Sequence, residues 1–141
     1  MGNTRQCRGN RGQAMLEGAL VCMILVNVLI GVLDMGQVLF IRQTFTARVR
    51  AAARYGAVTD AAETAIKNVV LYGQATAPEG APAGAFGLTA GMISVAKPDA
   101  GSSEQRVLVT ISGFPYRFYT PWIHGVFTGR DITASVPLET P

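Results

Sequence analysis

The strongest pattern along the chain is a run of apolar residues near its start. Residues 18–33, GALVCMILVNVLIGVL, contain no formal charge, and Asn27 is their only strongly polar side chain. About 20 apolar residues are needed to span the ~30 Å hydrocarbon core of a bilayer. Together with the apolar residues on either side, the run reaches this length. It therefore predicts a membrane-spanning helix.

Beyond this run the pattern narrows to a helical stripe. Apolar side chains recur at three- and four-residue steps, while Arg42, Arg50 and Arg54 lie on another face. The stripe consists of Val38, Ile41, Phe45, Val49 and Ala52. Because no proline interrupts this stretch, we expect one long helix over residues 13–56, apolar first and amphipathic second. The stripe is expected to be a seam along which sister helices pack.

A second, shorter helix is predicted after a stop or kink at residues 55–57. Asp60 and Glu63 have the spacing of a capping box, and apolar residues continue at helical steps as far as Gly73. Residues 73–91 are almost entirely Gly, Ala, Pro and small polar residues. Such a composition cannot bury much surface, so it predicts a flexible loop.

The period changes from helical to two in the last third of the chain. Apolar and polar side chains alternate in residues 93–96, 106–112 and 132–136, and residues 97–103 have the composition of a turn. Three short antiparallel strands are expected, with the long helix available to cover one face of the sheet. The predicted fold class is α+β: a long transmembrane and amphipathic helix, a second short helix and a small antiparallel sheet.

Aromatic residues gather in residues 114–127, between the last two expected strands. This stretch holds six of the eleven aromatics of the chain. These aromatics are interpreted as core residues of a small domain, as a subunit contact, or as a patch at the membrane–water interface, where Trp and Tyr favour the headgroup level. The sequence leaves these three interpretations open.

Positive charge is concentrated in residues 1–12. They contain Arg5, Arg8 and Arg11 and no acid, which accounts for the whole formal net charge of +3. Basic residues before a first hydrophobic helix hold the N-terminus in the cytoplasm and send the rest of the chain across. The positive charge is therefore read as a topology signal, and no nucleic-acid partner is expected.

The anomaly in the apolar segment is Glu17. A charged side chain at the bilayer centre costs roughly 3 kcal/mol on insertion scales, less near an end, and usually marks function. An acid in the first turn of a helix gains only a few tenths to about 1 kcal/mol from the helix dipole. Gly12 stands five residues before this acid. By itself, Gly12 could be a flexible joint, but the pair is not a feature of ordinary secretory signals.

Gly12 followed by QAMLE and a hydrophobic helix resembles a type IV prepilin processing site. More narrowly, the stretch RGQAMLEGALVCMILVNVLIGVLDMGQVLFIRQ resembles the TadE-like pseudopilins of the tight-adherence (Tad, or Flp) pilus, over roughly residues 11–56. Gly18 departs from the aromatic or large residue that the family often has. The resemblance implies cleavage between Gly12 and Gln13 by a membrane prepilin peptidase. Glu17 would then neutralise a new N-terminal amine, its own or a neighbour's, during assembly.

The resemblance also implies a place in the cell and a set of partners. A minor pilin of this family acts in Tad pilus assembly and adherence, with other Tad/Flp pilins, the assembly platform and membrane lipid as partners. It lies in the bacterial inner (cytoplasmic) membrane as a single-pass protein. The expected division is a leader at 1–12, a long helix at 13–56 and a small extracytoplasmic domain at 57–141. The competing interpretation is an uncleaved, membrane-anchored binding module.

The search for catalytic or metal-binding residues returns little. His124 is the only histidine, so neither a Ser/His/Asp triad nor a multi-histidine metal site can form within one chain. The acids outside the apolar run are scattered singly. Cys7 and Cys22 lie on opposite sides of the expected cleavage site and do not form a disulfide framework. No enzymatic activity, metal or cofactor is expected.

Overall fold

The computed structural model describes residues 9–80, 82–98, 105–121, 123 and 125–138. The chain divides into two compact units. Unit 1 consists of Met1–Gln37 and Phe118–His124, and unit 2 consists of Val38–Arg117 and Gly125–Pro141. The helix α1 runs through the first part of both units, and each unit is described below by itself.

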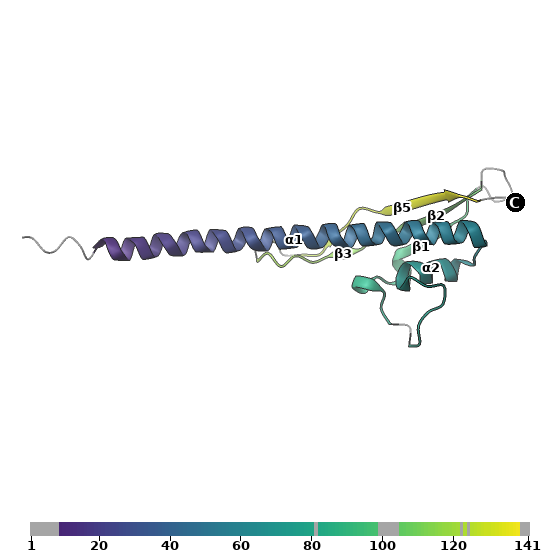
Figure 1. The fold of residues 1–141 in the computed structure, drawn as a ribbon, viewed down its shortest axis with the longest axis horizontal. Helices are drawn as coiled ribbons and strands as arrows, with labels where there is room; N and C mark the ends of the chain where they lie inside the picture. Colours follow the sequence, from purple (N-terminus) through teal and green to yellow (C-terminus); the bar gives the residue numbers. More distant parts are fainter. Residues whose placement is uncertain (1–8, 81, 99–104, 122, 124, 139–141) are drawn as a thin grey trace, which may run out of the picture. The chain divides into compact units, whose positions relative to one another are not determined.

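Helix α1 is one uninterrupted helix, Gly9–Thr59, and is longer than expected at both ends (Figure 1). The expected stop or kink at residues 55–57 is absent. Gly56 is buried there, and a Cβ atom on it would lie 2.6 Å from Cδ1 of Ile66. Since only glycine avoids this contact, Gly56 allows α1 to pack closely against the second helix instead of ending α1.

Helix α2, Glu63–Tyr72, confirms the expected second helix but not its expected start. The predicted capping box is wrong, because the N-cap residue is Ala62 and no side chain caps the helix. Asp60 has a positive φ of 43° and its carboxylate accepts a hydrogen bond from Lys97 Nζ instead. The end is as predicted: Gly73 adopts the left-handed conformation that closes a helix, and its N–H donates to Val69 O.

The three expected strands form one antiparallel sheet in unit 2. Strands β1 (Ile93–Ala96), β2 (Arg106–Ile111) and β5 (Ile132–Pro137) lie in the order β1-β2-β5 (Figure 1). In β2, Val107, Val109 and Ile111 are buried on one face, as their alternation predicts, and Leu108 is half-buried on the other. A second sheet, β3 (Pro115–Tyr116) with β4 (Phe127–Thr128), lies in the aromatic stretch and was not predicted.

The second half of the expected loop 73–91 is structured and packed. It contains two short 3-10 helices, η1 (Ala85–Gly87) and η2 (Ala90–Met92). Leu88 is fully buried, and the ring of Phe86 meets the ring of Phe45 at a centroid distance of 5.9 Å. The expectation that this stretch cannot bury surface is therefore wrong for Leu88, whereas Phe86 packs on Phe45 but stays 47% exposed.

The core of unit 2 draws on both helices, the three-stranded sheet and the loop before it. Its largest fully buried side chains are Phe45, Ile66, Leu88, Ile111, Val49, Val70, Val107 and Val109. Aromatic rings extend this core, since Phe45 packs edge-on against Phe114 at 4.7 Å and Phe114 against Tyr116 at 5.3 Å. The apolar stripe of the amphipathic part of α1 is thus part of the core of unit 2.

Candidate membrane-anchoring and assembly site

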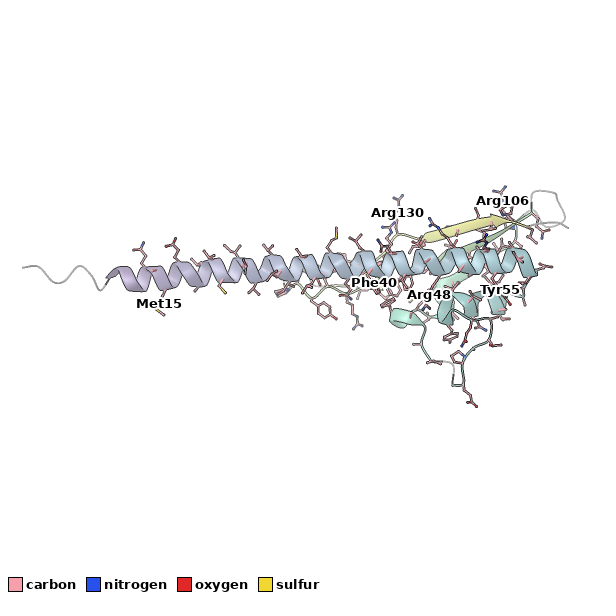
Figure 2. The ribbon with its side chains drawn as sticks, viewed as in Figure 1. Met15, Phe40, Arg48, Tyr55, Arg106 and Arg130 are labelled. Atoms are coloured by element: carbon pink, nitrogen blue, oxygen red, sulfur yellow. The ribbon has the colours of Figure 1, made fainter. Side chains whose placement is uncertain are left out.

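The N-terminal part of α1 presents apolar side chains on all its sides. Within the described residues, one helix is long and apolar enough to cross a membrane, and its most apolar window is unburied. Large exposed side chains run from Met15 to Leu33, and Figure 2 shows Met15 projecting from the helix. Residues 15–33 span about 28 Å of helix, close to the thickness of a hydrocarbon core. Asn27, the one strongly polar side chain of residues 18–33, donates to Met23 O at 2.8 Å, a bond that would lower its cost in lipid.

The expected cleavage site lies close to the start of α1. Gly12 and Gln13 are both exposed, and nothing lies within 4 Å of the position of a Cβ on Gly12. The first four N–H groups of a helix have no partner within it, so unwinding this turn costs few hydrogen bonds. The leader residues Arg5 and Arg8 lie outside the described residues, and so does the side chain of Arg11.

Glu17 is exposed and lies four residues after Gln13, so the two residues share one face of α1. Within the described residues, ion pairs join Glu63 to Lys67 and Asp60 to Lys97, and neither involves Glu17. Because the Glu17 carboxylate is exposed, a partner near the N-terminal end of α1 can reach it.

Asp34 is the site residue that the sequence did not reveal. Only 4% of it is exposed, although it directly follows the bare apolar run. One carboxylate oxygen, Oδ1, accepts a hydrogen bond from the Tyr119 N–H at 2.8 Å. The other, Oδ2, accepts from the Thr120 N–H at 2.8 Å and from the Thr120 hydroxyl. Three donors from one segment thus surround the acid within unit 1.

In the sequence, Asp34 is visible only as an acid at the end of an apolar run. Nothing in the sequence indicates its partner. The partner residues are 85 and 86 positions further along the chain. Two of the three bonds come from backbone N–H groups, which every residue but proline carries. Residue types alone therefore could not identify this contact.

Most of the predicted packing seam is buried against other parts of the same chain. Ile41, Phe45 and Val49 are buried in unit 2, and Val38 is half-buried. Their neighbours include the chain's own aromatic rings from the loop and from the segment before β3. The domain of the same chain thus covers most of this stripe, and packing of sister helices along it stays a prediction.

The aromatic side chains of residues 114–127 differ in their exposure, so the three interpretations of this stretch apply to different parts of it. Phe114 and Tyr116 are buried in unit 2, which agrees with the interpretation as core residues. Tyr119 and Phe127 are exposed, whereas Trp122 and His124 lie outside the described residues. The core interpretation thus accounts for the first part of the stretch and leaves its second part to another role.

Metal-binding and thiol chemistry have little support in the part of the chain that the structure describes. Within it, no group of three or more His, Cys, Asp or Glu side chains could hold a metal ion. Cys22 is a free, exposed thiol in the apolar run, and Cys7 lies outside the described residues.

A long apolar N-terminal helix, a second short helix and small antiparallel sheets make a pilin-like α+β arrangement. The family model described as TadE-like protein matches residues 12–54, which is the stretch from Gly12 to the amphipathic part of α1. Over this segment the chain is similar to the TadE-like protein family. A search of curated proteins and a search of solved structures returned no match.

Proposed function

We propose that this protein is a membrane-anchored pseudopilin that takes part in assembly of the Tad (Flp) pilus and in adherence. The observation that carries the proposal is the TadE-like match, which begins at Gly12 and covers a helix with a bare apolar first part. The role is structural and not catalytic. Its partners are other Tad pilins, the assembly platform and membrane lipid.

The proposed protein lies in the bacterial inner membrane with its N-terminus in the cytoplasm. The leader arginines Arg5, Arg8 and Arg11 favour this orientation, because basic residues are retained on the cytoplasmic side. A prepilin peptidase then cuts between Gly12 and Gln13. The exposure of both residues and their place near the start of α1 support access to this bond.

Cleavage creates a cationic amine on Gln13, beside the acyl region of the membrane. Glu17 lies one helical turn away and is exposed, so it can pair with its own amine or with that of a neighbouring subunit. In a medium of low dielectric such a pair is far stronger than in water. The pair would guide subunits as they leave the bilayer and pack helix on helix.

N-terminal sequencing of the purified protein, together with its intact mass, tests the cleavage. Mature protein is expected to begin at Gln13. Gly12→Ala should leave precursor, because the peptidase requires close approach to the backbone at this position. Gly18→Ala is the matched control, since a Cβ meets nothing within 4 Å at either glycine. Retention of Met1 in cells with a working pilus system would instead favour the uncleaved anchored binding module.

Substitution of Glu17 tests the pairing. Glu17→Ala and Glu17→Gln should insert normally and still be cleaved at least in part, but processed protein should accumulate in the membrane without pili. Leaving a buried charge alone costs roughly 3–5 kcal/mol per contact. Glu79→Gln, at an exposed acid in unit 2, is the control and should assemble normally. Normal piliation in both Glu17 variants would contradict the mechanism.

A further inference from the structure

Asp34 fixes a second segment of the chain at the end of the apolar run. Residues 15–33 are long enough to cross the hydrocarbon core, so the next residue lies at its boundary with water. Asp34 is that residue, and its carboxylate holds the backbone of Tyr119 and Thr120. All of these residues belong to unit 1. The held segment therefore lies at the same depth as the end of the run.

The chemistry of this contact suits a boundary with lipid. Backbone N–H groups without partners are costly near hydrocarbon, and a lone carboxylate is costly there too. We call the contact of Asp34 with Tyr119 and Thr120 the clamp. In the clamp, two N–H groups and a hydroxyl donate to the two carboxylate oxygens, so the donors and the acid satisfy one another. The clamp thus lets irregular backbone lie where water is scarce.

The held segment also presents suitable side chains. Tyr119 is 77% exposed and Ile123 is 42% exposed, and Pro121 is exposed as well. None of these three side chains carries a charge. On α1, the side chains of Leu33 and Met35 on either side of Asp34 are exposed and apolar. Tyrosine is typical of the headgroup level, where its ring meets acyl chains and its hydroxyl meets water.

We propose that Tyr119, Pro121 and Ile123 form a membrane-interface foot that Asp34 holds against the lipid headgroups at the outer end of the anchor. The foot rests on the proposed function in one respect, namely that α1 spans a membrane. It goes beyond that function because it assigns lipid as the partner of a segment that lies far from the helix in the sequence. Asp34 acts in it as a positioning residue.

Depth-dependent fluorescence quenching tests the foot in the full chain. Cys7 and Cys22 are replaced by serine, and one cysteine is introduced at a time for a fluorescent label: Ile123→Cys, Tyr119→Cys, Leu25→Cys or Val58→Cys. The protein is reconstituted in phosphatidylcholine vesicles that contain lipid with a nitroxide either on its headgroup or at the end of its acyl chain. Labels at the foot should be quenched by the headgroup nitroxide. The Leu25 label should be quenched by the acyl-chain nitroxide, and the Val58 label by neither.

The outcomes separate the foot from the anchor. A quenched Leu25 label with unquenched labels at Tyr119 and Ile123 would overturn the foot and leave the membrane anchor intact. An unquenched Leu25 label would overturn the anchor itself, and the foot with it. Foot labels that lipid does not quench but that cross-link to a second copy of the chain would show that a sister subunit covers this segment, which also contradicts the proposal.

Variants of the clamp test the role of Asp34. Asp34→Ala removes the acceptor of all three hydrogen bonds, so headgroup quenching of the Ile123 label should be lost while quenching of the Leu25 label stays. Thr120→Val removes only the hydroxyl donor and keeps both N–H bonds, so most of the quenching should persist. Unchanged quenching of the Ile123 label in Asp34→Ala would show that Asp34 does not position the foot.

Discussion

The two halves of α1 are both rich in apolar residues, but they differ in what covers them. Along residues 15–33, all large hydrophobic side chains except the half-buried Ile30 are between 45% and 80% exposed. Along residues 41–57, the apolar stripe is at most 5% exposed. The first half is apolar on every side apart from Glu17 and Asn27, and the second carries Arg42, Arg50 and Arg54 away from its stripe. One helix thus has a first half that the chain leaves uncovered and a second half whose stripe its own domain covers.

The difference shows how far the arrangement of apolar residues on a helix determines what can pack against it. A narrow stripe can be buried completely by a small domain of the same chain, which is what Phe45 and Val49 show. A helix that is apolar all round cannot be covered on one side only, so it needs a surrounding apolar phase or several partners. For the first half of α1, the proposed surroundings are lipid and later the helices of sister subunits.

The largest expected effect on stability comes from a truncation in the buried stripe. Phe45→Ala removes a fully buried ring that contacts Phe86 and Phe114. Its cost should be about 3–5 kcal/mol, comparable to the whole stability of a small domain. Urea unfolding of the full chain in detergent micelles, followed by near-ultraviolet circular dichroism, measures the loss. Leu25→Ala, in the bare half, is the matched control and should change the same transition by less than about 0.5 kcal/mol. Equal effects of the two variants would contradict the comparison.

The elements that the sequence predicted are those with a regular period. The alternation of Val107, Val109 and Ile111 gave the buried face of β2, and the helical steps gave the stripe of α1. Such patterns are visible because each side chain repeats the same environment at a fixed interval. Gly73 was predictable for a related reason, since few other residues adopt the left-handed conformation that closes α2.

The contacts that the sequence did not predict depend on single residues that meet across long separations. Phe86 stands in a stretch of small residues and packs on α1, although composition indicated a loop without a core contact. Asp34 is bound by backbone groups that have no signature in the sequence. Asp60 had a capping spacing, but an ion pair with Lys97 and a positive φ take the place of the cap. In each case tertiary context outweighed the local pattern.

A smaller effect is expected where the second half of α1 meets α2. Nη1 of Arg48 donates to Val70 O at 3.2 Å and to Leu71 O at 2.7 Å, and Figure 2 labels this side chain on α1. These carbonyls belong to the last turn of α2, where they lack partners within the helix. Arg48→Ala should therefore cost about 1.5–3 kcal/mol of domain stability. Arg50→Ala, at an exposed position two residues later, should stay within about 0.5 kcal/mol in the same urea titration. A larger loss in the Arg50 variant would argue against Arg48 as the residue that caps α2.

The smallest expected effect lies just past the end of α1, where the buried stripe has ended. Asp60 is exposed and pairs with Lys97 at 2.6 Å, and such surface pairs contribute about 0.2–1 kcal/mol. Asp60→Asn should cost no more than this, because asparagine tolerates the positive φ of 43° at this residue. Asp60→Ala should cost about 1–2 kcal/mol more, since alanine adds the strain of a left-handed backbone. Urea unfolding in low and high salt distinguishes the two causes: salt should remove the difference between the wild type and Asp60→Asn, but not the difference between the two variants. If salt instead removed the second difference, the loss in Asp60→Ala would be electrostatic, and backbone strain at Asp60 would play no part in how the chain leaves α1.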